Sequence, residues 1–330
     1  MKQKASLGDL RIAVDGMGGD FGPRLAFEAC CIFLAQNPGV AIDFFVQEPF
    51  LAPSEPPQHL CLVLCQEAVL AQDSPAFVLR HKQASSMGQA LAALRAGRVQ
   101  ACVTAGNTGG LVMLAAHILG MQPDVSRPVL CTPVPTQNGA TWLLDLGGVL
   151  APDAPRLLEY ACLGAAEATR VLKRRVRVAL LNLGQEAEKG PKVVREAADL
   201  LAAHSEFDYM GFVEPAGLFA GDADVVVCDG LMGNMVLKSA EAAAATVLNA
   251  LRSQFAANPW RRLLAGLFQG VFRQARAQLH PSALNGARLL GVNGVVVKSH
   301  GGADKEAFLA ALHAALRAVE VSAGQVINSD

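Results

Sequence analysis

Six apolar runs of this chain each end in a turn rich in glycine, aspartate and asparagine. Glycines let backbone N–H groups approach an anion closely, and a helix that follows such a turn adds the positive end of its dipole. One turn of this kind would be weak support for a binding site, but six predict parallel strands whose carboxyl ends meet at one crevice. The turns span residues 15–20, 104–110, 145–148, 182–190, 229–234 and 291–294.

The length and composition of the chain fit a large globular unit. It has 330 residues, of which 52% are hydrophobic and 17% charged, so it can bury an extensive core. Strand-like runs alternate with helical patterns and no low-complexity linker separates them, which predicts one α/β domain over residues 1–330. No uninterrupted apolar stretch precedes Asp9, so we expect neither a signal peptide nor an anchor, and a cytoplasmic location.

Eight cysteines are present without paired CxxC elements, which indicates reduced thiols. Cys102 and Cys228 lie in strand-like apolar runs, so we expect them to be small buried hydrophobes. The sequence therefore predicts no thiol chemistry, no metal and no cofactor.

Residues 242–303 form a basic segment. They contain seven lysines and arginines and no acid, so a chain of net charge −1 carries +7 here and −8 elsewhere. Within the segment, Asn258 and Pro259 predict the start of a helix, after which apolar side chains recur at helical spacing as far as Phe272. Together with the preceding helix, this pattern predicts an amphipathic helical hairpin at about residues 245–280.

The hairpin has two interpretations. Its apolar stripe fits a packed hairpin or a dimer interface, and its cations fit contact with a membrane or an acidic partner. Seven cations without one acid favour the second interpretation. The residues predicted to make this membrane or carrier-protein contact are Arg252, Trp260, Arg261, Arg262, Leu264, Leu267, Phe268 and Arg273.

Two lysines and one histidine are the candidate anion ligands on or beside the glycine-rich turns. Lys189 follows a Gly-Gln-Glu turn, and Lys238 lies four residues after Asn234, one helical turn further on. Either ammonium can neutralise phosphate as a compact charge, although a lone lysine also fits a solvated surface. His300 fits either a ligand or a loop histidine that only satisfies backbone groups.

Seven segments resemble, in the same order, the PlsX family of phosphate acyltransferases, and together they cover almost the whole chain. They are DGMGGDFGP from Asp15, SSM from Ser85, AGNTG from Ala105, LDLG from Leu144, LNLG from Leu181 with Lys189 and Gly190, ADVVVCDG from Ala223 with Gly233, Asn234 and Lys238, and LGVNGVVVKSHG from Leu290.

The resemblance implies a three-layer α/β/α fold with a mostly parallel sheet, similar to isopropylmalate dehydrogenases and phosphotransacetylases, from which the hairpin protrudes. It implies transfer of a fatty acyl group from acyl carrier protein to inorganic phosphate. The acyl phosphate would serve phospholipid synthesis through a downstream glycerol-3-phosphate acyltransferase. The resemblance also implies a homodimer held peripherally on the inner face of an anionic membrane, and no nucleic acid partner.

The resemblance also assigns residue roles. Phosphate is itself the nucleophile, so the protein must hold it against the thioester, offset its charge and stabilise the oxyanion. Lys189, Asn234 and Asn107 are assigned to catalysis. The residues assigned to substrate binding are Asp15, Gly18, Gly19, Asp20, Thr108, Asp145, Lys238, Asn293 and His300.

The chain departs from the family pattern at two loop positions. Val149 stands where the family has asparagine, and Gly88 where it has arginine, which predicts fewer polar contacts in the crevice if both positions face it. Two other functions stay open. One is a phosphotransacetylase acting on coenzyme A thioesters, and the other is a catalytically silent scaffold that recruits lipid enzymes to a membrane.

Overall fold

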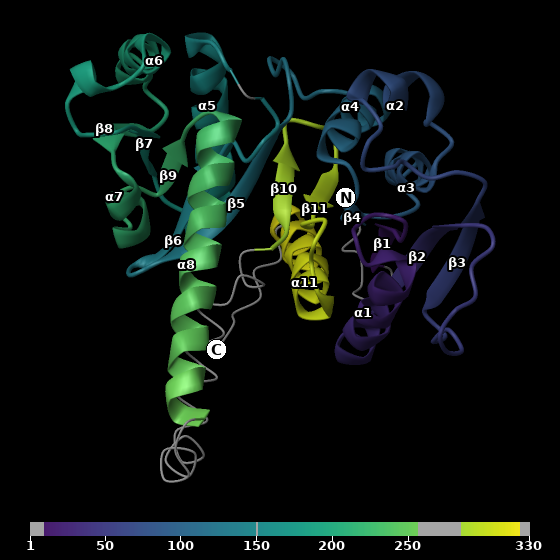
Figure 1. Cartoon of the computed structure of the whole chain (residues 1–330). Coiled ribbons are helices and arrows are strands. Elements are labelled where there is room, and N and C mark those ends of the chain that lie inside the picture. Colours follow the sequence, from purple (N-terminus) through teal and green to yellow (C-terminus); the bar gives the residue numbers. More distant parts are fainter. Residues whose placement is uncertain (1–9, 150, 257–284, 324–330) are drawn as a thin grey trace.

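The computed structural model describes residues 10–149, 151–256 and 285–323 (Figure 1). The strands are β1 (Leu10–Asp15), β2 (Val40–Gln47), β3 (Leu60–Cys65), β4 (Ala101–Thr104), β5 (Val129–Thr136), β6 (Gly139–Leu144), β7 (Arg177–Leu181), β8 (Asp208–Val213), β9 (Val225–Val227), β10 (Ala287–Leu290) and β11 (Val295–Lys298). The helices are α1 (Gly22–Gln36), α2 (Pro75–His81), α3 (Ser86–Arg95), α4 (Thr108–Leu119), α5 (Ala154–Leu172), α6 (Lys192–Ala202), α7 (Pro215–Ala220), α8 (Gly230–Ala256) and α11 (Lys305–Ser322). A 3-10 turn spans Ala187–Lys189.

The strands form one sheet, and the strand direction reverses at the centre of the sheet. Its order is β3-β2-β1-β4-β11-β10-β5-β6-β9-β7-β8. The antiparallel pairs β11–β10, β10–β5 and β5–β6 lie side by side in the middle, and the pairs on either side of them are parallel. The predicted mostly parallel sheet is therefore confirmed. We call β1–β4 and β11 the first half of the sheet, and β6–β9 the second half.

The strands of the second half run opposite to those of the first half, which corrects one expectation. Carboxyl ends of strands meet at one edge only when the strands run in the same direction. The turns after β6, β7 and β9 therefore leave the sheet at the edge opposite to the turns after β1 and β4. Residues 291–294 also lie at that opposite edge, because they connect the antiparallel strands β10 and β11.

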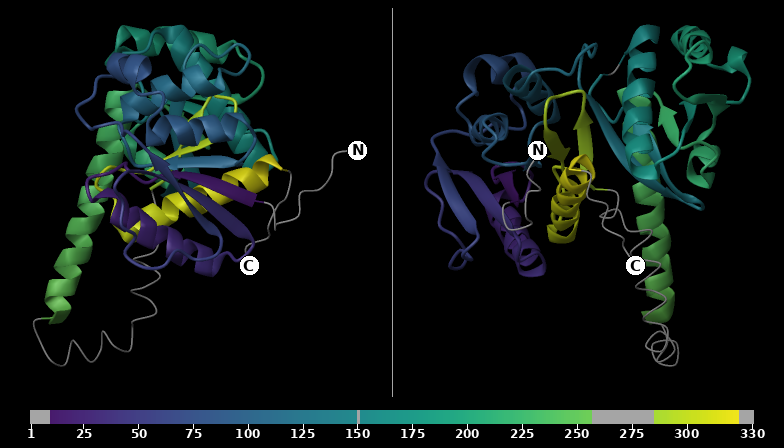
Figure 2. Two further views of the ribbon diagram at one scale, coloured as in Figure 1. Left: turned by 90° about the vertical axis from the view of Figure 1, so that its right-hand side faces the viewer. Right: turned by 180° about the vertical axis from the view of Figure 1, so that it is seen from behind.

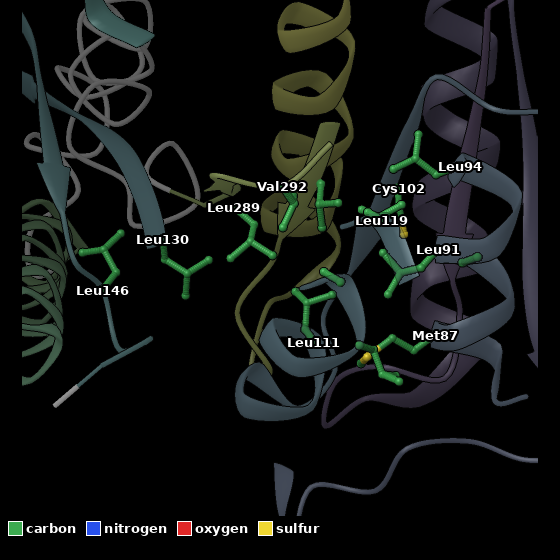
Figure 3. Packing of buried hydrophobic residues seen from close by; sticks show 14 of the residues in the cluster. Met87, Leu91, Leu94, Cys102, Leu111, Leu119, Leu130, Leu146, Leu289 and Val292 are labelled. Atoms are coloured by element: carbon green, nitrogen blue, oxygen red, sulfur yellow. The ribbon is translucent and has the colours of Figure 1, made fainter. Parts of the chain in front are cut away.

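Helices cover both faces of the sheet, which confirms the predicted three layers. Successive side chains of a strand point to opposite faces: Ala13 packs with α3 and α4, whereas Ile12 and Val14 pack with α1 and α11. In the second half, α5 and α6 cover the same face as α1 and α11. Figure 3 shows Leu111 of α4 near Leu289 of β10 in the core of the other face.

The C-terminal helix α11 is capped by Asp304, which accepts a hydrogen bond from the backbone N–H of Ala307 at 2.8 Å. The predicted burial of two cysteines is confirmed. Cys102 and Cys228 are buried, and burial raises the pKa of both thiols well above the ordinary value.

Helix α8 extends well beyond the sheet (Figure 2). Beyond Glu241 none of its residues with a described side chain is buried, and Val247 and Leu251 are 55% and 44% exposed. The predicted second helix lies outside the described residues, as do Trp260, Arg261, Arg262, Leu264, Leu267, Phe268 and Arg273 and the side chain of Arg252. Over the ranges given above, no helix has the length and apolar character needed to span a bilayer.

Candidate anion-binding site

A polar cavity of about 240 Å³ lies over the central strands, between the two halves of the sheet. Leu130 and Thr132 of β5 and Ala287 of β10 line it. These three side chains point to the face that α3, α4 and α8 cover, because they alternate with residues that face α5 and α11. Loops that leave opposite edges of the sheet therefore meet across its face.

Four of the predicted site residues line this cavity. Thr108 is the first residue of α4 and His300 follows β11, so both come from the first half. Asn234 and Lys238 come from the start of α8, after β9 of the second half. The N-terminus of α4 at Thr108 adds the positive end of a helix dipole, which favours an anion.

Lys298 is a cavity residue that the sequence analysis did not single out. It ends β11, is 8% exposed, and its Nζ donates to the carbonyl oxygen of Ala105 at 3.3 Å and to that of Ser299. Burial lowers the pKa of Lys298 to about 8, although the negative charge of Asp15 opposes this shift. A lysine that ends an otherwise apolar strand, directly before a Ser-His-Gly loop, is the signal that was available in the sequence.

Glu241 lies directly behind the lining and contacts two of its residues. Its Oε2 is 2.9 Å from Nζ of Lys238, and its Oε1 is 3.2 Å from Nε2 of His300. Nζ of Lys238 is also 3.3 Å from Nδ1 of His300, so the three side chains form a closed cluster. Burial raises the pKa of Glu241, but His300 and Lys238 outweigh it and leave the pKa below its ordinary value.

The start of α8 is fixed against the turn that follows β6. Asp229 caps the helix by accepting a hydrogen bond from the N–H of Met232 at 2.8 Å. A Cβ at Gly233 would lie 1.9 Å from the carbonyl oxygen of Asp145, so only glycine allows this approach. Asp145 itself is buried and accepts hydrogen bonds from four backbone N–H groups, including that of Val149 at 2.7 Å. It shapes the cavity wall and does not line the cavity.

Asp15 holds together three segments of the first half. Its buried carboxylate accepts hydrogen bonds from the hydroxyls of Ser86 and Thr104, each at 2.7 Å. Burial raises its pKa, although these hydrogen bonds act in the opposite direction. The turn that follows packs closely, since a Cβ at Gly18 would lie 2.3 Å from the backbone nitrogen of Gly106.

The rest of that turn contacts the loop after β11. The backbone N–H of Asp20 donates to the carbonyl oxygen of Gly301 at 2.8 Å, and Gly19, with a φ of +96°, lies against the same carbonyl. Gly301 lines the cavity, whereas Gly19 and Asp20 do not. Their contacts place the His300 loop.

Three other predicted residues do not line the cavity. Asn107 caps α4 and donates to three backbone carbonyls of residues 70–73, so its amide fixes a neighbouring loop. Nζ of Lys189 lies 2.9 Å from Oε2 of Glu186, and the lysine side chain is 58% exposed. Asn293 donates to the carbonyl oxygens of residues 119 and 121 at the opposite edge of the sheet, because the β10–β11 hairpin turns there.

The two departures from the family pattern also lie away from the cavity lining. A Cβ at Gly88 would lie 2.1 Å from the carbonyl oxygen of Gln83, which precedes α3, so this close backbone contact excludes a side chain. The backbone of Val149 contributes its N–H to Asp145 and its carbonyl to Gly230, and neither bond depends on the side chain. Neither residue is part of the described cavity lining, and the effect of these two departures on substrate binding stays a prediction.

No cluster of three His, Cys, Asp or Glu side chains suited to a metal ion occurs in the part of the chain that the structure describes. The described cavity lining contains lysine, histidine, asparagine and hydroxyl side chains but no carboxylate. This arrangement is suited to a small anion with more than one negative charge.

Comparison with solved structures shows the same fold in enzymes of two kinds. A branched-chain phosphotransacylase from Enterococcus faecalis V583 superposes with a TM-score of 0.61 at 16% identity, covering 94% of this chain and 99% of the other. A 4-hydroxythreonine-4-phosphate dehydrogenase from Klebsiella pneumoniae gives a TM-score of 0.55 at 13% identity, covering 94% and 99%. At these identities the likeness establishes the fold alone.

Sequence comparison establishes the family. The model of the family described as "Fatty acid synthesis protein" matches residues 10–325. A phosphate acyltransferase of Saccharophagus degradans is 40% identical over 320 residues, covering 96% of this chain and 93% of the relative. A phosphate acyltransferase of Teredinibacter turnerae is 38% identical over 317 residues, covering 95% and 96%. The chain therefore belongs to the phosphate acyltransferase family of acyl-transferring enzymes.

Proposed function

We propose that this protein transfers a fatty acyl group from acyl carrier protein to inorganic phosphate, and that the acyl phosphate is used in phospholipid synthesis. The observation that carries the proposal is the cavity over β5 and β10. Two lysines, a histidine and two asparagines meet there, and no carboxylate is present in its described lining. Phosphate is small enough for the cavity and carries the charge that this lining favours.

The proposed reaction needs no residue to act as nucleophile. A phosphate oxygen attacks the thioester carbonyl carbon, the new C–O bond forms, and the C–S bond breaks. The carrier thiolate leaves and takes a proton from water. The ammonium groups of Lys238 and Lys298 offset the phosphate charge, and holding both reactants in one site supplies effective concentration worth about 7 kcal/mol. The amide of Asn234 is the candidate donor to the carbonyl oxyanion.

Lys189 is retained in this proposal as a catalytic residue. It follows β7, which pairs with β9, so its turn leaves the sheet at the same edge as the turn that leads into α8 and Asn234. Its ammonium is exposed and pairs with Glu186 at the surface, an interaction of low strength. This placement supports a catalytic role in which Lys189 contacts the substrate once the substrate covers the turn.

We also propose that the enzyme is a homodimer that associates peripherally with an anionic membrane surface. Support comes from the basic segment 242–303 and from the outer part of α8, where Val247 and Leu251 are exposed. A stripe of exposed apolar side chains next to many cations suits an anionic lipid surface.

The silent-scaffold alternative loses its main support. It depended on Val149 having removed a polar group from the crevice, but this residue does not line the described cavity. The coenzyme A alternative is decided by the acyl donor, because both donors present the same thioester to phosphate.

The deciding experiment measures release of free carrier protein from acyl carrier protein, with and without inorganic phosphate, and compares acyl-coenzyme A as donor. We expect release that depends on phosphate and is faster from the carrier protein. Asn234→Ala and Lys189→Ala should each reduce turnover by roughly tenfold to a hundredfold, the effect of losing a hydrogen bond to a charged group. Phosphate-dependent turnover of acyl-coenzyme A alone would favour the alternative, and no release from either donor would refute acyl transfer.

A further inference from the structure

We propose that Glu241 is a positioning residue for the anion cavity, which holds Lys238 of α8 and His300 of the loop after β11 together so that both present their donors to a bound phosphate. This inference rests on the proposed function for its kinetic consequences. Its binding consequence, weaker capture of inorganic phosphate when Glu241 is changed, can be measured without any acyl donor.

Glu241 contacts residues on both sides of the cavity. Glu241 lies three residues after Lys238 on the same helix, the spacing that brings two side chains to one face, and its Oε2 is 2.9 Å from Nζ of Lys238. Its other oxygen faces His300, which belongs to the first half of the sheet. One carboxylate therefore connects the two sides of the cavity.

Glu241 lies behind the cavity lining, unlike the two residues that it contacts. Lys238 and His300 line the cavity, whereas Glu241 does not, and its side chain is only 10% exposed. A carboxylate in the lining would repel phosphate. Because Glu241 lies behind the lining, it can hold Lys238 in place without contacting the bound phosphate.

Burying the carboxylate of Glu241 costs free energy. A buried charge is unfavourable unless its partners compensate for desolvation, so a buried ion pair is weak support for a purely stabilising role. Oε1 is buried and has no aligned hydrogen-bond donor, although Nε2 of His300 lies 3.2 Å from it. A buried carboxylate oxygen without an aligned donor, next to a ligand cavity, fits a residue that positions its neighbours for anion binding.

The cluster also favours one tautomer of neutral His300. Nζ of Lys238 can only donate, but it lies 3.3 Å from Nδ1 and 3.5 Å from Nε2, so this contact does not by itself decide which nitrogen accepts. An ionised carboxylate oxygen can only accept, and Oε1 of Glu241 lies 3.2 Å from Nε2, so Glu241 favours a hydrogen on Nε2. Glu241 thereby holds one tautomer and one ring orientation, and this gives the proposal a spectroscopic signature.

The test compares Glu241→Ala and Glu241→Gln with a matched control, Glu28→Gln. Glu28 also pairs with a lysine, since its Oε2 is 2.6 Å from Nζ of Lys305, but that pair joins α1 to α11 away from the cavity. Calorimetry with inorganic phosphate should show binding weakened about tenfold or more in Glu241→Ala. Glu241→Gln, which keeps an oxygen for Lys238, should be weakened less, and the control should match the wild type.

Kinetics and spectroscopy separate positioning from mere support of the fold. The KM for phosphate should rise more than kcat falls, because Glu241 does not touch the reacting carbonyl. Nitrogen NMR of the His300 ring, assigned by its loss in His300→Gln, should show the Nε2–H tautomer in the wild type and a tautomer mixture in Glu241→Ala.

The outcomes are distinguishable from failure of the proposed function. If the wild type binds phosphate but does not cleave the thioester, the proposed function fails and the phosphate affinity still decides the role of Glu241. If Glu241→Ala does not fold, Glu241→Gln decides through the same titration and ring spectrum. Wild-type phosphate affinity and an unchanged His300 tautomer in the folded variants would overturn the inference.

Discussion

Two opposing requirements act on the side chain of Lys298. The cavity needs its positive charge to hold an anion, while its position at the end of a buried strand disfavours that charge. The balance is a pKa lowered from 10.5 to about 8, with burial as the largest cause. A bound phosphate would restore the missing counter-charge, so anion binding and protonation of Lys298 favour each other.

This coupling predicts that phosphate affinity falls as the pH rises through about 8. The ammonium of Lys298 is charged below its pKa and neutral above it. At higher pH, Lys298 must therefore take up a proton when phosphate binds, and this lowers the affinity. Lys298→Met keeps the length of the apolar stem and removes the charge. We expect it to bind phosphate roughly tenfold more weakly at neutral pH, and to show no further loss near pH 8. Titration calorimetry across this pH range measures both, and a flat wild-type profile would contradict the assignment.

At the scale of elements, the glycine-rich turns identified strand ends but not strand directions. The strands before the turns at residues 15, 104, 145, 182 and 229 all end where those turns begin. Direction depends on connections, and β5 and β6 are joined only by Gln137 and Asn138, a link that permits antiparallel pairing alone. That short polar link, followed by Gly139 with a φ of +121°, was the available signal for the reversal.

The position of a site residue relative to the turns decided whether the sequence could predict it. Thr108 and His300 lie at a helix start and on a loop, and Asn234 and Lys238 lie within the first three turns of α8, so residue type with the neighbouring turn was enough to find them. Glu241 lies well inside α8, where a glutamate is usually solvated, so only the folded structure reveals its contacts with Lys238 and His300.

Asp224 links the starts of β7 and β9. Its carboxylate accepts two hydrogen bonds from Arg174, each at 2.8 Å, and others from Arg177. Burial raises the pKa of Asp224, but these arginines outweigh it and hold the pKa well below its ordinary value. A lowered pKa stabilises the fold above the unfolded-state pKa of about 4, and this contribution is lost as the pH falls below it.

Asp224→Asn should therefore lower the free energy of unfolding at neutral pH by about 1.5 kcal/mol, the low end for a charged hydrogen bond because both arginines are partly exposed. The difference from the wild type should shrink as the pH falls below about 4. Denaturant unfolding at several pH values measures it. Asp208→Asn is the control, since its pair with Arg175 is half exposed on both sides and should contribute less; equal losses in the two variants would contradict the argument.

For the whole molecule, the site depends on the two halves of the sheet being held in one arrangement. Lys298 and His300 come from one half, Asn234 and Lys238 from the other, and the central antiparallel strands β5 and β10 form the base between them. The outer part of α8 contributes nothing to the described cavity lining. Substitutions in the outer part of α8 should therefore change membrane binding without changing turnover.

The last prediction tests this separation with two charge insertions: Val247→Glu with Leu251→Glu on the exposed side of α8, and Leu267→Glu with Phe268→Glu outside the described residues. If this region binds anionic lipid, each nearby cation contributes about 1 kcal/mol and the apolar side chains add more, so wild-type binding should be reversible and weaken with salt. Either pair should release the enzyme from anionic vesicles in a sedimentation assay and leave turnover of soluble acyl carrier protein largely unchanged. Variants that stay on the vesicles would exclude this region as the contact. Variants that become monomeric in sedimentation velocity would instead identify a dimer interface.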